Sequence, residues 1–190
     1  RGRSPSLVAL THAHPDHLGA AAAVCQAFSA PLACHAADAD AAAGKAPMQP
    51  SGWQITISNQ VFGGPPHPVS RLLSEGDELA GFRVWHAPGH TPGHLVLFRE
   101  QDGVAIVGDV LLGMHLVTLR AGLHSPPPFF CTDVAENRRS MLKVFEARPS
   151  QILFGHGRPQ PSGPNWDDFA AGIQKQVFEA SHRDDRLESA

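Results

Sequence analysis

The sequence predicts a mixed α/β fold in which short strands alternate with helices. Short apolar runs recur along the chain and end beside glycine or proline, as buried strands do where they open into loops. An alanine-rich segment at residues 18–28 and an amphipathic segment at residues 134–147 have the length and spacing of helices. The 190 residues, 42% of them hydrophobic, are expected to form one domain over residues 1–190 with a sizeable core.

The first part of the chain is expected to form a strand, a helix and a second strand before an irregular region. Residues 7–10 form the first strand, and residues 18–28 form a helix whose small side chains allow close packing. Residues 31–35 form a short second strand. Residues 38–52 combine an alanine run with glycine and proline, which indicates a broken helix and a loop, and residues 61–68 form a connector.

The middle of the chain is expected to form an antiparallel meander, because turn sequences around Gly76 and Gly103 separate apolar runs. Its four strands are predicted at residues 69–73, 81–86, 95–99 and 104–108. The helix at 134–147 follows, and its inward face is expected to comprise Met141, Leu142, Val144 and Phe145. Residues 152–154 form a last inner strand, and residues 167–179 form a closing helix before a polar tail.

The segment Thr-His-Ala-His-Pro-Asp-His at residues 11–17 carries most of the functional information. Side chains alternate along an extended strand end, so His12 and His14 point the same way. Once the chain turns, Asp16 and His17 can face a second point nearby. Neutral imidazoles and an ionised carboxylate are the ligands that a borderline divalent metal prefers. The segment therefore indicates two adjacent metal sites.

Three further segments supply candidate ligands from a distance. His90 lies in Ala-Pro-Gly-His-Thr-Pro-Gly-His, Asp109 follows the apolar run at 104–108, and His156 lies in Phe-Gly-His-Gly. Each residue stands at the end of a predicted strand or beside a glycine, where a strand opens into a loop. Strand ends that meet at one edge of a sheet commonly form functional sites. We therefore expect these residues to complete the two metal sites.

Taken in order, these motifs make the chain resemble the metallo-β-lactamase superfamily. His-x-His-x-Asp-His stands at residues 12–17, Gly-His-Thr-x-Gly-His at 89–94, Gly-Asp at 108–109 and Gly-His-Gly at 155–157. The resemblance implies that family's four-layer αββα sandwich. In the family several strands precede the first motif, so the chain is expected to be the larger C-terminal part of the sandwich, incomplete at the N-terminus.

The resemblance also implies a role for each ligand. The first metal ion is expected to be bound by His12, His14 and His90. The second is expected to be bound by Asp16, His17 and His156, with Asp109 bridging both. His94 is expected to support the site without binding metal. The cofactor is two divalent ions, zinc by first choice, although iron and manganese accept the same ligands.

The expected function is that of a binuclear metal-dependent hydrolase. Two close divalent ions can share a hydroxide near neutral pH, and this hydroxide attacks a carbonyl carbon while the ions stabilise the oxyanion. Asp16 is the expected catalytic residue, since it would orient the hydroxide and receive a proton. The expected substrates are thioesters, lactones or carboxylic esters, as in glyoxalase II-like and lactonase-like relatives. The chain has no tyrosine, so it lacks the tyrosine contacts to substrate of those relatives.

Residues 110–131 are expected to supply an apolar wall of the substrate pocket, selecting a moderately hydrophobic acyl or ester group. Its bulky candidates are Met114, His115, His124, Phe129 and Phe130. The alternative for the two phenylalanines is that they anchor this loop to the core. The alternative functions are a mononuclear iron thiol (persulfide) dioxygenase on the same scaffold, a nuclease, or a non-catalytic binding module.

Charge and composition argue against nucleic acid and membrane as partners, so the expected partner is a small-molecule substrate. A net charge of −3 with scattered lysines and arginines gives no general attraction to nucleic acid. No apolar run approaches the roughly 20 residues that span a bilayer, so no membrane partner is expected. Cys25, Cys34 and Cys131 do not form a disulfide framework, which favours a reducing, cytoplasmic location. The sequence does not predict an oligomeric state.

Overall fold

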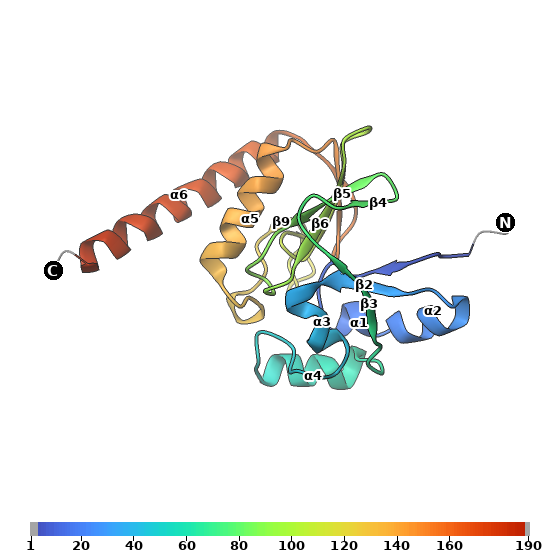
Figure 1. Cartoon of the computed structure of the whole chain (residues 1–190). Coiled ribbons are helices and arrows are strands. Elements are labelled where there is room, and N and C mark those ends of the chain that lie inside the picture. The colour runs from blue at the N-terminus through green and yellow to red at the C-terminus, as the bar shows by residue number, and fades with distance from the viewer. Residues whose placement is uncertain (1–3, 189–190) are drawn as a thin grey trace.

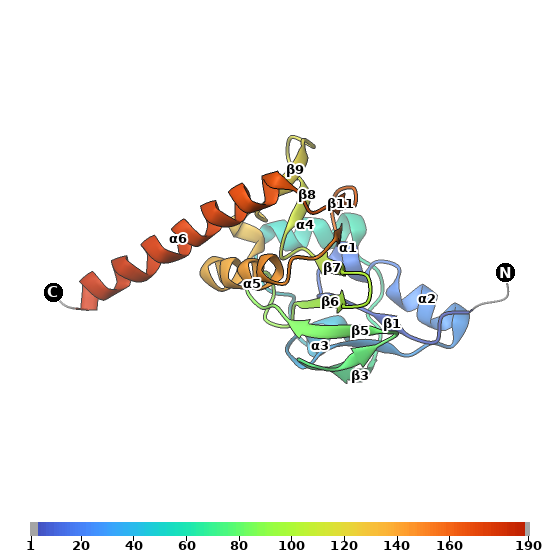
Figure 2. The same cartoon turned by 90° about the horizontal axis from the view of Figure 1, so that it is seen from above.

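Two β-sheets face each other between two layers of helices (Figures 1 and 2). The computed structural model describes residues 4–188. Helices α1 to α4 lie against the smaller sheet, and α5 and α6 lie against the larger one (Figure 1). This order of layers is the αββα sandwich that the sequence predicts.

The smaller sheet contains three parallel strands in the order β1-β2-β3. They are β1 (Val8–Ala9), β2 (Leu32–His35) and β3 (Val69–Leu73). Parallel neighbours need crossover connections, which here contain the helices of the first layer. Those helices are α1 (Pro15–Leu18), α2 (Ala21–Phe28), α3 (Ala36–Ala42) and α4 (Trp53–Phe62).

The prediction that residues 69–73 begin the meander is wrong. Strand β3 pairs in parallel with β2, with Ala33 opposite Arg71 and His35 opposite Leu73. An apolar pattern specifies which face of a strand is buried, but not which strand lies beside it. Leu73 is fully buried between the two sheets, whereas Ser70, Arg71 and Leu72 are exposed. The predicted strand at 69–73 is therefore present, but it lies at the edge of the smaller sheet.

The larger sheet contains six strands in the order β11-β10-β7-β6-β5-β4. They are β4 (Glu78–Leu79), β5 (Phe82–His86), β6 (Leu95–Arg99), β7 (Val104–Gly108), β10 (Gln151–Phe154) and β11 (Gln160–Pro161). The antiparallel pairing of β5, β6 and β7 confirms the predicted meander for these strands. Strand β10 pairs in parallel with β7 and places Phe154 beside Gly108. Asp109 and His156 therefore leave the sheet at the same edge.

Three segments differ from the prediction in their local structure. The helix expected at 18–28 is α2, which begins three residues later, at Ala21, and the short helix α1 that precedes it, across Gly19 and Ala20, was not predicted. A Cβ atom on Gly19 would lie 2.3 Å from the carbonyl oxygen of Phe62, so glycine permits the close approach of α1 to the end of α4. Helix α4 and the hairpin of β8 (Leu112–Met114) and β9 (Ala121–His124) were not predicted.

Helix α5 (Val134–Glu146) covers the outer face of the larger sheet, and the first part of α6 (Pro164–Glu188) packs against α5 before the helix extends away from the body of the molecule (Figures 1 and 2). Asp133 caps α5 by accepting a 2.9 Å hydrogen bond from the backbone nitrogen of Glu136. The inward face of α5 is as predicted for Met141, Val144 and Phe145, which are buried, whereas Leu142 is partly buried. Helix α6 is longer than the helix predicted at 167–179.

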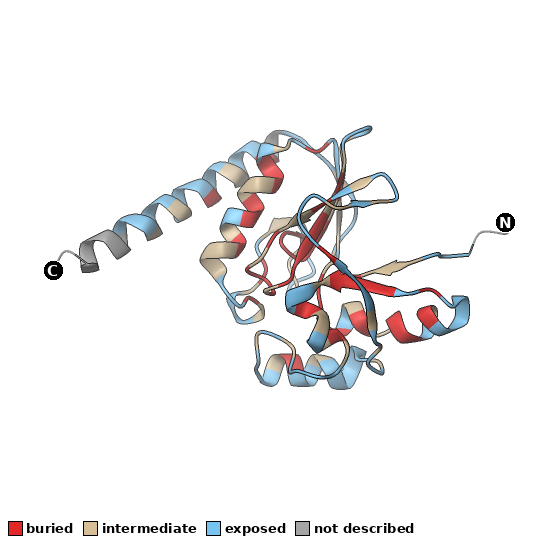
Figure 3. Ribbon diagram, in the orientation of Figure 1, coloured by how far each residue is buried: buried red, intermediate tan, exposed pale blue. Residues whose placement is uncertain are grey.

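Buried side chains form a core at each of the three layer boundaries (Figure 3). Leu32 lies under the first helix layer, Val84 and Leu95 lie between the sheets, and Ile152 lies under α5 and α6. The three cysteines are free and buried, in agreement with the expectation that they form no disulfide framework. Within the described residues, the helices are too short or too polar to cross a membrane.

Candidate metal centre

Loops at one edge of the sandwich bring all seven predicted ligands together. One group of metal-compatible side chains comprises His12, His14 and His90, and a second comprises Asp16, His17, Asp109 and His156. In each group the candidate ligand atoms lie within 4.8 Å of one another. The first group comes from the loop after β1 and the loop between β5 and β6, and the second from α1 and the ends of β7 and β10.

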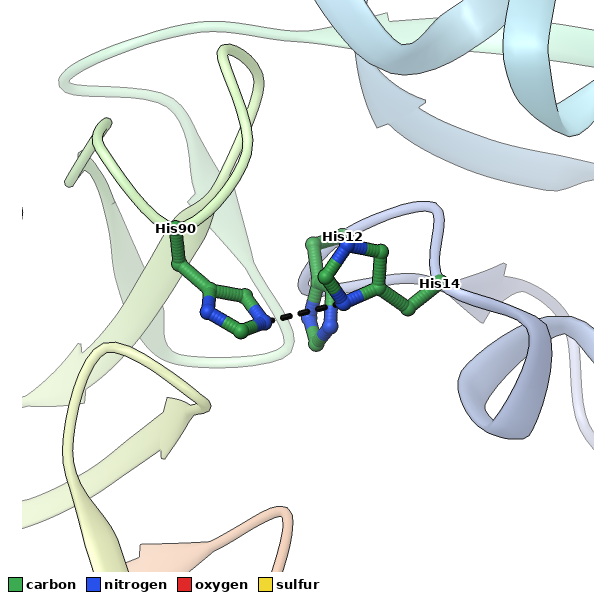
Figure 4. A group of neighbouring side chains, drawn as sticks. All are labelled: His12, His14 and His90. Carbon is green, nitrogen blue, oxygen red and sulfur yellow. Dashed lines mark hydrogen bonds between the residues drawn. The ribbon is translucent and has the colours of Figure 1, made fainter. Parts of the chain in front are cut away.

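The three imidazoles of the first group point toward one another (Figure 4). Each also has one nitrogen in contact with a group outside the cluster. His14 Nε2 donates to the carbonyl oxygen of Gln49 at 2.8 Å, which leaves Nδ1 facing His90 Nε2 at 2.9 Å. His12 Nδ1 lies 3.1 Å from Thr11 Oγ1, and His90 Nδ1 lies 3.8 Å from Cys131 Sγ. Such outer contacts hold the ring and the tautomer of a metal-binding histidine.

The second group is arranged around Oδ2 of Asp109. This oxygen lies 3.2 Å from His156 Nε2 and 3.5 Å from His17 Nε2. It also lies 3.8 Å from His90 Nε2, which belongs to the first group. Asp16 Oδ2 lies 3.0 Å from His156 Nε2. Asp109 is therefore placed between the two groups, in the position of a bridging carboxylate.

Burial and neighbouring charge set the protonation of the two groups differently. Burial, together with the surrounding imidazoles, lowers the pKa of His12 and of His90 well below the ordinary value, so both rings are neutral. Burial alone would raise the pKa of Asp109, but hydrogen bonds from His156 and His17 hold it well below its usual range. Hydrogen bonds to Asp109 and Asp16 raise the pKa of His156 to about 10.

The donor set fits a pair of divalent cations. His12 Nε2 and Asp109 Oδ1 are buried and have no hydrogen-bond partner among the described residues. Buried polar atoms without a partner are rare and call for an explanation, which a cation would supply here. Gly155 leaves room for these ligands, because a Cβ atom there would lie 2.1 Å from Asp109 Oδ1 and 2.7 Å from His17 Cε1. Nitrogen and oxygen ligands of this kind suit zinc, iron or manganese.

The family model described as the metallo-beta-lactamase superfamily matches residues 1–156. The chain belongs to this superfamily. It is 28% identical over 176 residues to the probable metallo-hydrolase YflN of Bacillus subtilis (strain 168), covering 84% of this chain and 66% of that protein. It is 27% identical to the probable metallo-hydrolase YybB of the same organism, covering 81% of this chain and 65% of that protein. The chain thus spans about two thirds of the length of these curated relatives.

Solved structures of the superfamily agree with this assignment. The crystal structure of TTHA1623 in a di-iron-bound form has a TM-score of 0.62 and 28% sequence identity, over 83% of this chain and 72% of that chain. The BLEG-1 B3 metallo-beta-lactamase also has a TM-score of 0.62, with 26% identity over the same shares of the two chains. The protein therefore shares its fold and part of its sequence with these two members of the superfamily.

Asp38 joins the two histidine loops of this metallo-β-lactamase-like site, and the sequence did not predict it. The carboxylate, 3% exposed, lies in the first turn of α3. Its Oδ2 accepts from the backbone nitrogen of Ala13 at 2.9 Å and from Thr91 Oγ1 at 2.7 Å. Its Oδ1 accepts from the backbone nitrogen of Gly93 at 2.7 Å. The only signal in the sequence was an acidic residue within an alanine run.

His94 lies behind the metal centre, as expected. The ring is fully buried, and its Nε2 accepts a 3.1 Å hydrogen bond from the backbone nitrogen of Asp109. Burial lowers the pKa of His94 to about 3, which keeps Nε2 able to accept. Gly108 has a φ of +53°, and a Cβ atom there would lie 2.8 Å from both His94 Nε2 and Thr11 Oγ1. This glycine permits the close packing that positions Asp109.

A cavity of about 490 Å³ opens over the two groups of ligands. Met114, Phe129 and Phe130 line it, as the sequence predicts for the wall formed by residues 110–131. The opposite wall comes from α4, through Trp53, Ile57 and other residues, and was not predicted.

The structure does not bring His115 and His124 to this cavity. His115 Nδ1 accepts hydrogen bonds from the backbone nitrogens of Val117 and Thr118, each at 3.2 Å. The rings of His115 and His124 pack against each other with their centres 5.3 Å apart. Neither residue is among those that line the cavity over the ligands. Both side chains are used locally to shape the β8–β9 hairpin, so the expected pocket role of these two residues is corrected here.

Proposed function

We propose that the chain carries the catalytic centre of a binuclear metal-dependent hydrolase that cleaves a thioester, lactone or carboxylic ester. The observation that carries this proposal is the position of Asp109, whose Oδ2 lies 3.8 Å from His90 and 3.2 Å from His156 in the two separate groups. The similarity to YflN and YybB, both probable metallo-hydrolases, supports hydrolysis. The di-iron-bound form of TTHA1623 supports a pair of ions.

The two groups would hold the ions as the sequence motifs predict. His12, His14 and His90 present inward-facing nitrogens for the first ion. Asp16, His17 and His156 would hold the second ion, and Asp109 would be shared between the two ions. When bound, two divalent ions in these positions supply a water that is acidic near neutral pH and positive charge beside the oxyanion of the attacked carbonyl.

The two carboxylates have different tasks because they differ in exposure. The Asp16 side chain is 27% exposed and lines the cavity, whereas the Asp109 side chain is 5% exposed. Asp16 can therefore orient the attacking water and receive its proton at Oδ2. Asp109 is held by His17 and His156 and by the contact of its backbone with His94, so it serves to fix the distance between the two groups.

Kinetic measurements with matched variants test this function. We expect hydrolysis of at least one member of a panel of aryl esters, thioesters and lactones. Asp16→Asn should lower kcat by about 100-fold or more, the usual contribution of a proton acceptor in the reaction. His182→Ala is the control, since His182 is exposed on α6 outside both groups and should leave kcat unchanged.

One result would favour the alternative function, a mononuclear iron dioxygenase with the same fold, over the proposed hydrolase. A preparation that contains one iron per chain, consumes oxygen with a thiol or persulfide substrate and hydrolyses none of the panel would indicate a mononuclear dioxygenase. Substrate turnover that Asp16→Asn leaves unchanged would contradict the assigned role of this carboxylate.

A further inference from the structure

The mouth of the cavity is apolar on two opposite sides. Trp53 and Ile57 lie one helical turn apart on α4, and their side chains are 69% and 50% exposed. Val117 and Leu119, in the loop between β8 and β9, are 76% and 69% exposed. All four residues line the same cavity that opens over the metal ligands. Large apolar side chains gathered at the rim of a cavity indicate a binding surface.

Away from the proposed metal ligands, the same cavity offers no cationic side chain to a charged substrate. Among the described residues that line it, none is a lysine or an arginine. Away from the metal ligands, its polar side chains are Gln54 and Ser58, which are uncharged. A carboxylate or phosphate at a distance from the reacting carbonyl would lose water on entering and find no partner of opposite charge.

The geometry points to a substrate that is a neutral ester, thioester or lactone with an apolar hydrocarbon chain, and places that chain between α4 and the loop at residues 115–120. The identity of the bond that is cleaved rests on the proposed function. The binding of the substrate's hydrocarbon chain rests only on the apolar mouth of the cavity. Phe130 lies at the inner end beside the ligands, since its ring centre is 6.5 Å from that of His14. The carbonyl end of the substrate then lies over the metal centre.

Binding of inert analogues tests the inference without any turnover. We would titrate N-alkyl acetamides, from butyl to decyl, into the protein and measure Kd by calorimetry. Each methylene buried should lower Kd by up to about fourfold, the equivalent of its transfer from water. Ile57→Ser and Val117→Ser, on opposite walls, should each weaken this dependence on length. Phe28→Ser is the matched control, because Phe28 is exposed on α2 and does not line the cavity.

Two results of the binding measurements would overturn the inference. One is a Kd that does not change with chain length in the unmodified protein. The other is equal affinity for an analogue of the same length that ends in a carboxylate. Ester hydrolysis with no preference for chain length would also contradict it while leaving the proposed function intact. Chain-length-dependent binding without hydrolysis would instead uphold the inference and contradict the proposed function.

Discussion

Asp38 accepts a hydrogen bond of 2.7 Å from Thr91 Oγ1 through the same oxygen that accepts from the backbone nitrogen of Ala13. Ala13 lies between His12 and His14, and Thr91 follows His90. One buried carboxylate on α3 therefore fixes the two backbone segments that carry the first group of ligands. The positions of His12, His14 and His90 therefore depend on a residue that is not itself a proposed metal ligand.

Replacing Asp38 with asparagine should weaken metal binding. The amide places NH₂ where one of the three donors now points, so at least one buried hydrogen bond is lost. We expect metal affinity to fall by about 10- to 100-fold, as for other residues that orient metal ligands. Competition with a chromophoric chelator measures this change. Asp40→Asn, an exposed position on the same helix, should have the affinity of the unmodified protein.

Replacing Gly155 with alanine should remove the second ion and keep the first. The new methyl group would lie 2.1 Å from Asp109 Oδ1 and 2.7 Å from His17 Cε1, so both side chains must move. Metal content by elemental analysis should fall from two ions per chain toward one. Gly172→Ala on α6 is the control, because its Cβ atom would have no neighbour within 4 Å. Equal loss of both ions in Gly155→Ala would contradict the separate assignment of the two groups.

Metal binding should release a proton at the second group and none at the first. The pKa of His156 is about 10 in the metal-free protein, so this ring is protonated at neutral pH and must lose its proton to bind an ion. His12 and His90 are already neutral, because burial lowers the pKa of each. Calorimetry in buffers of different ionisation enthalpy counts the released protons. A His156→Ala variant should release one proton fewer, and an unchanged count would contradict the assignment of this proton to His156.

The metal-free protein should lose stability as the pH falls below 6.5. Burial lowers the pKa of His94 from 6.5 to about 3 and also lowers that of His12 and His90, so the unfolded chain binds protons in this range that the folded chain does not. For each such histidine, the free energy of unfolding falls by up to about 1.4 kcal/mol for each unit that the pH falls. Urea unfolding in the presence of a chelator at pH 7 and pH 5 measures the difference. Equal stability at both pH values would contradict neutral buried histidines.

The sequence was most informative where chemistry and local pattern coincide. Residues 11–17 place four metal-compatible side chains directly after an apolar run, and His90, Asp109 and His156 follow the same rule at other strand ends. Because the ends of β7 and β10 lie at one edge of the larger sheet, these distant residues meet, as the motif spacing predicts. Their binding of metal stays a prediction, although the structure brings their ligand atoms together.

The features that could not be predicted depend on contacts distant in sequence. The residues of β3 form a strand equally well beside β2 or beside β5, so its place in the smaller sheet was not predictable from its own sequence. Helix α4 has a weakly amphipathic sequence, because much of its apolar surface faces the cavity and solvent instead of the core. Asp38 carries no motif, and its importance arises only when α3 packs against both histidine loops.

The number of metal ions per chain tests the central claim most directly. Native mass spectrometry of the purified chain, and of a His156→Ala variant, counts bound ions without any assumption about substrate. We predict two ions in the unmodified chain and one in the variant, because His156 belongs to the second group only. A single ion in the unmodified chain, retained unchanged in His156→Ala, would contradict the binuclear centre.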